Sequence, residues 1–150
     1  MKDNFLMKYI SKLSRLAILY RGDKLSAFGL NAHQHIYIIT ICNNPGISQD
    51  KLAEEIFVNK SNVARQIAML CENGFVTKKV SEADKRQCEI YPTQKAIDIY
   101  PQVIEVLREW NRIIFKDFTD DEKEIFKNLI EKALSNALQN YKERRHQWLN

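Results

Sequence analysis

The sequence predicts a mainly helical protein that carries one small β-hairpin. Along most of its 150 residues, apolar side chains recur three or four positions apart, which is the spacing of an amphipathic helix. Only four glycines and three prolines interrupt the chain, too few for a fold with many tight turns. The exception is a pair of β-leaning runs, FVTKKV and EIYPT, that flank the charged segment SEADKRQ. With 45% apolar residues, the chain has the size and composition of one globular domain.

The first two helices are predicted from their apolar periodicity. One spans about Asn4 to Tyr20 and is followed by a loop between Gly22 and Gly29. The second runs from about Ala32 to Cys42 and stops at NNPG, where each residue type favours a turn. Its apolar run IYIITIC is too short to span a bilayer, so we expect a buried helix and no membrane contact.

A helix-turn-helix and a hairpin follow. Ser48 is placed to cap a short third helix, SQDKLAEEI, and FVN makes a tight connection into a fourth. Gly74 is expected to end the fourth helix in a left-handed conformation. In the hairpin, Pro92 suits a strand end because proline has no amide hydrogen to donate.

Two long helices complete the chain. Thr93 begins the first, and Thr119 with Glu122 fits a capping box at the start of the second. The helices at both ends of the chain carry more apolar surface than one small lobe can cover, which indicates an interface. The alternative is that the two ends pack on each other within one monomer.

Composition and charge exclude several classes of function. The N-terminus MKDNFLMKYISKL mixes charges among its apolar residues, which is not typical of a signal peptide, so a cytoplasmic protein is expected. The net charge of +4 is compatible with nucleic acid but is weak support by itself. No glycine-rich phosphate loop or nucleophile–base pattern is present, so we do not expect an enzyme. The three cysteines lack CxxC spacing, and no metal or other cofactor is expected.

The fourth helix has a polar face suited to reading DNA. A rotation of 100° per residue gathers within one arc of about 80° the side chains of Asn62, Arg65, Gln66, Met69 and Asn73. Arg pairs with guanine, and Asn or Gln with adenine, in the major groove. The helix begins with Lys60, Ser61 and Asn62, whose backbone amides suit phosphate. The alternative is an ordinary solvated face.

Five short motifs occur in order within residues 47–96. They are Leu52 and Ala53; Ser61, Val63 and Arg65; Leu70, Gly74, Phe75 and Val76; Asp84 and Arg86; and Thr93 and Lys95. In this order and spacing they resemble the winged-helix core of the MarR family of transcriptional regulators. The resemblance implies one domain over residues 1–150, with a winged helix-turn-helix lobe at about 32–95 and long dimerisation helices at about 1–25 and 96–150. It implies a homodimer that binds a pseudo-palindromic operator in double-stranded DNA, with repression as the expected mode.

The resemblance also gives SEADKRQ a role as the tip of the wing. We expect Arg86 to enter the minor groove, where a narrow A·T-rich groove attracts arginine, and Lys85 to contact phosphate. Asp84 is expected to hold the hairpin beside Arg86. Ser81 stands where the family often has an acidic residue, so the wing network is expected to be looser or to use Glu82. Ser48 is the remaining residue expected to bind DNA. For SEADKRQ, the alternative is a charged turn that only keeps the hairpin soluble.

A small aromatic or anionic effector is a further implication of the family. Its pocket would lie between the dimerisation helices and the winged lobe. The residues expected to supply its aromatic walls and a cation are Tyr20, Arg21, His33, Tyr37 and Trp110. Two alternatives stay open. One is redox control through Cys88 beside the wing, since Cys42 and Cys71 suit buried packing. The other is a winged-helix module that binds protein in place of DNA.

Overall fold

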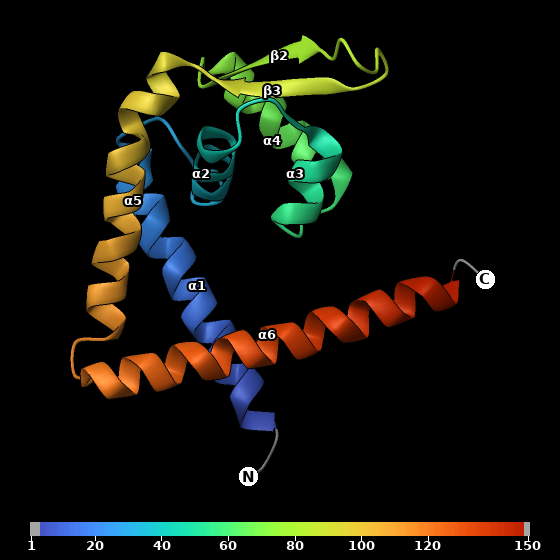
Figure 1. Ribbon diagram of the computed structural model, residues 1–150. Coiled ribbons are helices and arrows are strands. Elements are labelled where there is room, and N and C mark those ends of the chain that lie inside the picture. The colour runs from blue at the N-terminus through green and yellow to red at the C-terminus, as the bar shows by residue number, and fades with distance from the viewer. Residues whose placement is uncertain (1–3, 149–150) are drawn as a thin grey trace. The chain divides into compact units, whose positions relative to one another are not determined.

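The protein contains six helices and three short strands in the part of the chain that the structure describes. The computed structural model describes residues 4–148 and, among these, the side chains of residues 5–142. The elements are α1 (Asn4–Ser26), α2 (His35–Asn43), β1 (Ile47–Ser48), α3 (Gln49–Glu55), α4 (Lys60–Glu72), β2 (Val76–Val80), β3 (Cys88–Pro92), α5 (Gln94–Ile114) and α6 (Asp120–Trp148). This order confirms the predicted mainly helical fold with one β-hairpin (Figure 1).

Helix α1 is longer than its periodicity predicts. It continues to Ser26, so the prediction that a loop begins at Gly22 is wrong. A glycine inside a helix costs only about 1 kcal/mol relative to alanine, and the last turn of α1 is retained because it buries Leu25 completely. The helix ends at Ser26, and the turn that follows it contains Gly29, which has a left-handed φ of 76°.

The core of the winged lobe lies among α2, α3, α4 and the sheet. The fully buried side chains of these elements include Ile38 and Ile41, Leu52, Val63, Ile67 and Leu70, and Ile90. Together with Phe75 they belong to one hydrophobic cluster. In Figure 1 the three helices lie beneath β2 and β3, which leaves the hairpin at the edge of the lobe. Burial of this apolar surface is the main force that holds the lobe together.

The sheet is antiparallel, with the strand order β1-β3-β2. In the hairpin, Val76 pairs with Pro92, Lys78 with Ile90 and Val80 with Cys88. Pro92 is the last residue of its strand, which confirms the prediction for it. Hydrophobic periodicity does not predict β1, because a strand of two residues is too short to show a period.

Contacts within the chain are concentrated in two units, residues 1–110 and residues 111–150. In the second unit, the predicted capping box at α6 is confirmed. The amide of Thr119 donates to Oε2 of Glu122 (2.8 Å), and the amide of Glu122 donates to Oγ1 of Thr119 (3.2 Å). No helix within residues 4–148 combines the length and apolar character needed to cross a membrane.

Candidate nucleic-acid interface

Side-chain caps fix the two helices of the helix-turn-helix. Oγ of Ser48 accepts a hydrogen bond from the amide of Lys51 (3.2 Å), so Ser48 caps α3 as predicted. Asn59, which the sequence reasoning missed, caps α4 because its Oδ1 accepts from the amide of Asn62 (2.8 Å). The amide of Asn62 is therefore engaged, and the prediction that it lies free for phosphate is wrong. An Asn immediately before an amphipathic helix was the available signal.

The outward face of α4 differs from the predicted one. Val63, Ile67 and Leu70 are completely buried, as expected. Gln66 lies with them on the core side and is only 8% exposed, so its predicted place on the DNA-reading surface is wrong. Asn62 is half-buried at the edge of the exposed face, whose residues are Lys60, Ser61, Arg65, Ala68, Met69 and Glu72.

Arg65 carries the guanidinium group of this exposed face. One of its terminal nitrogens, Nη2, donates to Oδ1 of Asn62 at 3.1 Å. Burial raises the pKa of the nearby Tyr37, and the positive charge of Arg65 opposes that shift. Arg65 therefore stands beside the lobe core with its side chain exposed, as a residue that reads a base requires.

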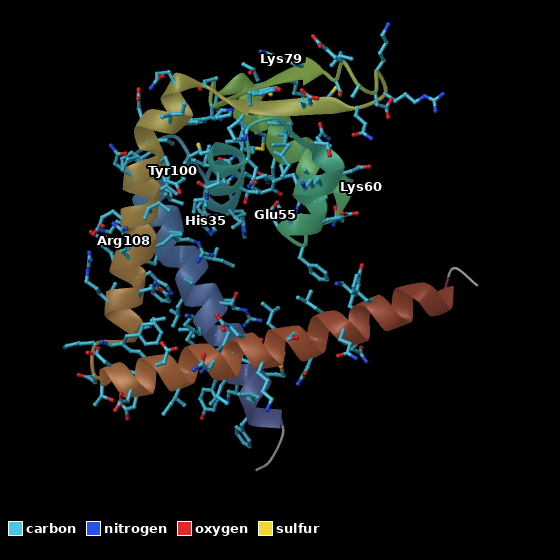
Figure 2. The ribbon with its side chains drawn as sticks, viewed as in Figure 1. His35, Glu55, Lys60, Lys79, Tyr100 and Arg108 are labelled. Carbon is cyan, nitrogen blue, oxygen red and sulfur yellow. The ribbon has the colours of Figure 1, made fainter. Side chains whose placement is uncertain are left out.

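Lys60 begins α4 and is already paired. Its Nζ lies 2.8 Å from Oδ2 of Asp50 in α3, and both side chains are exposed. In Figure 2, Lys60 lies on the outer side of the helix-turn-helix. Exposed pairs of this kind are weak, so a phosphate can compete for the ammonium group.

The C-terminal end of α4 is tied to the start of α5. Nζ of Lys95 donates to the carbonyl of Asn73 (2.8 Å) and stacks over the ring of Phe75, 4.2 Å from its centroid. Oγ1 of Thr93 donates to the carbonyl of Gly74 (2.7 Å), which has the predicted left-handed φ, 75°. A cation at this end also interacts favourably with the helix dipole.

The wing tip is a hydrogen-bonded turn with exposed cations. Oδ1 of Asp84 accepts from the amide of Arg86 (3.0 Å), and the carbonyl of Asp84 accepts from the amide of Gln87 (2.9 Å). Asp84 therefore fixes the backbone that carries Arg86. The side chains of Lys85 and Arg86 are both exposed.

Glu89 supplies the carboxylate that holds the base of the wing, whereas the sequence predicts a network that is looser or uses Glu82. The hydroxyl of Tyr91 donates to Oε2 of Glu89 at 2.8 Å. Hydrogen bonds from Tyr91 and then from Ser81 lower the pKa of the Glu89 carboxyl. Ser81 is nearly buried, at 7% exposure, and Lys79 lies over the ring of Tyr91, 4.9 Å from its centroid. Ser81 thus takes part in a closed network through a carboxylate on the opposite strand.

A polar cleft of about 400 Å³ lies at the base of the wing. It is lined by Asn44, Pro45, Gly46, Ile47, Ser48, Lys51, Ser81, Gln87 and Glu89. None of the five residues predicted for an effector pocket lines it. Tyr37 is only 2% exposed and belongs to the lobe core, so its predicted place in a pocket wall is wrong.

The other predicted effector residues lie along α1, the segment before α2, and α5. The rings of Tyr20 and Trp110 are 5.4 Å apart, and the Tyr20 hydroxyl donates to Oε2 of Glu109 (2.8 Å). Nε of Arg21 donates to the carbonyl of Ala32 (3.2 Å), and burial lowers the pKa of this guanidinium. His33 is exposed.

The thiol groups occupy different environments. Cys88 is exposed at the start of β3, whereas Cys42 and Cys71 are half-buried and pack against the core cluster. Burial raises the pKa of Cys42, which makes its thiolate less accessible. Among the side chains that the structure describes, no three His, Cys, Asp or Glu residues are grouped as a metal site would require.

The family model, the relatives in sequence and the solved structures that match this chain all indicate the same family. The sequence model of the MarR family matches residues 28–87. The transcriptional regulator YybA of Bacillus subtilis, of the helix-turn-helix type, is 29% identical over 133 residues, which is 89% of each chain. A MarR protein from Peptoclostridium difficile is 31% identical, with a TM-score of 0.85 over 88% of this chain and 86% of that one. A MarR family regulator from Listeria monocytogenes complexed with 26mer DNA is 26% identical, with a TM-score of 0.84 over 89% of each chain.

Proposed function

Because the chain belongs to the MarR family of transcriptional regulators, a DNA-binding and non-enzymatic family, we propose that it represses transcription as a homodimer on a pseudo-palindromic operator. The observation that carries the proposal is the exposed Arg65 on a helix that is fixed at both ends. A wing whose tip presents Lys85 and Arg86 flanks that helix. The proposed place of action is the cytoplasm.

The proposed contacts divide between bases and backbone. Arg65 reads a guanine in the major groove, and Asn62, which already holds its guanidinium, sets the angle of approach. Ser48, Lys60 and Ser61 lie at the starts of α3 and α4 and serve phosphates. Arg86 enters the adjacent minor groove, Lys85 contacts phosphate, and Asp84 holds the turn that presents them.

The proposed dimer would cover apolar surface on the terminal helices. Eight large apolar side chains of α1 are between 39% and 66% exposed: Phe5, Leu6, Met7, Tyr9, Ile10, Leu13, Leu16 and Leu19. On α6, Ile125, Leu129, Ile130, Leu134 and Tyr141 are between 47% and 61% exposed. Monomeric proteins rarely leave apolar patches of this extent in water, which favours a second copy of the chain as the partner.

A small aromatic or anionic effector is the proposed signal. The rings of Tyr20 and Trp110 offer an aromatic wall, and Arg21 and His33 offer cationic or hydrogen-bonding groups. Arg21 is desolvated enough to lower its pKa, so an anion beside it would gain a stronger attraction than in bulk water.

The central experiment measures binding to the duplex DNA upstream of the protein's own reading frame. We expect the affinity to fall steeply as salt rises, because phosphate contacts release counterions. Arg65→Ala should remove about 1 to 3 kcal/mol of discrimination between operator and random DNA. Arg86→Ala should weaken binding tenfold or more, about 1.4 kcal/mol.

Arg108→Ala is the matched control for both variants. It removes the same charge from an exposed arginine of α5 that pairs only loosely with Glu105, at 3.8 Å (Figure 2). Equal losses for Arg65→Ala on operator and random DNA would assign Arg65 to phosphate. No measurable binding by the wild type at about 100 mM salt would instead favour the protein-binding module.

A further inference from the structure

Three side-chain amides meet inside the winged lobe, and one of them belongs to the recognition helix. We call Asn31, Gln34 and Gln66 the amide cluster. Nε2 of Gln34 donates to Oε1 of Gln66 (3.2 Å), and Nδ2 of Asn31 donates to the same oxygen (3.4 Å). Oε1 of Gln34 accepts from the backbone amide of Asn31 (2.9 Å). Gln34 is 1% exposed and Gln66 is 8% exposed.

Burial makes these bonds specific for one placement of α4. A buried amide loses free energy when its hydrogen bonds are broken, because water does not replace them. The apolar neighbours Val63, Ile67 and Leu70 tolerate small rotations and shifts of the helix, since contact between methyl groups has no direction. The two hydrogen bonds that converge on Oε1 of Gln66 do not tolerate such shifts of the helix, because hydrogen bonds weaken steeply away from linearity.

The segment that supplies the donors is itself attached to α1. Nε of Arg21 donates to the carbonyl of Ala32 (3.2 Å), and Nδ1 of His35 lies 3.1 Å from the same oxygen. The glycine at position 22 also lies close to this segment, since a Cβ there would be 3.7 Å from Cβ of Ala32. Residues 31–35 therefore join α1 to the recognition helix through polar contacts on both sides.

We propose that the amide cluster positions the recognition helix: the Gln34–Gln66 bond holds α4 in the rotation that directs Arg65 outward and thereby sets operator discrimination. This inference rests on the proposed function. Gln66 and Arg65 are adjacent on the helix, so a rotation that releases Gln66 from the core moves Arg65 away from the base it reads. Gln34 is a positioning residue because it lies on another element and reaches DNA only through Gln66.

The test compares Gln34→Leu, Gln66→Leu and the double variant. The dissociation constants for an operator duplex and for a shuffled duplex of the same composition are measured for each protein. Discrimination is the dissociation constant for the shuffled duplex divided by that for the operator. We expect each single variant to lower this ratio about tenfold, which is 1.4 kcal/mol. The double variant should lose little more than either single variant, because both remove the same bond. Gln102→Leu, an exposed glutamine of α5, is the matched control and should keep the wild-type ratio.

A second variant separates hydrogen bonding from packing. In Gln34→Glu the introduced carboxyl group, when protonated, donates to Oε1 of Gln66, but the ionised form offers only acceptors. Burial raises the pKa of such a carboxyl above its ordinary value of about 4.3. We therefore expect the operator discrimination of Gln34→Glu to recover toward the wild-type value as the pH falls from about 8 to about 5.5, relative to wild type at each pH.

Three outcomes would overturn the inference while leaving DNA binding intact. Folded Leu variants with wild-type discrimination would show that the bond positions nothing. A loss in Gln66→Leu without a loss in Gln34→Leu would mean that Gln66 touches DNA directly. If the discrimination of Gln34→Glu does not respond to pH, the amide cluster acts through packing and not through its hydrogen bond. If the wild type itself does not discriminate, the proposed function fails instead.

Discussion

His35 shows how one half-buried side chain links the stability of the lobe to pH. Burial, and then the charge of Arg21, lower its pKa from 6.5 to about 4. Between these values the unfolded chain binds a proton that the folded chain does not, so the free energy of unfolding falls as the pH drops from about 6.5 to about 4. The folded lobe therefore keeps the ring neutral against the carbonyl of Ala32.

Replacing His35 should flatten this dependence. We expect urea unfolding of His35→Gln to show a shallower loss of stability with acid than the wild type, because the titrating group is gone. His33→Gln, an exposed histidine two residues away, is the matched variant against which the slope is compared. If the free energy of unfolding falls equally steeply for the wild type and for His35→Gln between pH about 6.5 and 4, His35 is not the source of this pH dependence.

Single residues also mark where sequence reasoning fails. Polarity placed Gln66 on the outer face of its helix, together with Arg65. The side chain is buried because its oxygen meets donors from Asn31 and Gln34, more than thirty positions earlier in the chain. Helical periodicity carries no information about such a partner, whereas Val63, Ile67 and Leu70 were predictable because burial of apolar groups needs no particular partner.

At the scale of elements, α4 depends on its cap. Asn59→Ala removes the acceptor for the amide of Asn62 and should lower the free energy of unfolding by about 1 kcal/mol, within a range of about 0.5 to 2. Chemical denaturation of the purified protein measures this directly. Asn59→Ser keeps an oxygen at the cap and is expected to lose much less. Equal losses in the two variants would show that the cap contributes nothing.

Element boundaries were predictable wherever one residue type controls them. Gly74, Pro92 and the Thr119–Glu122 capping box each lie where their chemistry placed them. The extent of α1 was not predictable, because Gly22 marks a turn only when burial does not outweigh its low helix propensity. Leu25, which provides that burial, gains its partners from elements later in the chain.

At the scale of the whole molecule, the exposed apolar face of α1 predicts self-association. Leu16→Glu places a charge in the middle of that face, where Leu16 is 55% exposed. Analytical ultracentrifugation at micromolar concentration should give a dimer for the wild type and a shift toward monomer for this variant. Ser14→Glu introduces the same charge at an exposed polar position of α1 and should remain dimeric. A wild type that sediments as a stable monomer would exclude the dimer.

The proposed mode of action, a dimer that reads two half-sites, is tested most directly by a hydroxyl-radical footprint on the bound upstream duplex. Recognition helices related by a two-fold axis are expected to protect two patches whose centres lie about 10 base pairs apart, or a multiple of that spacing. The wings should add flanking protection that disappears in Arg86→Ala. A single protected patch, or uniform weak protection along the duplex, would contradict operator recognition by a homodimer.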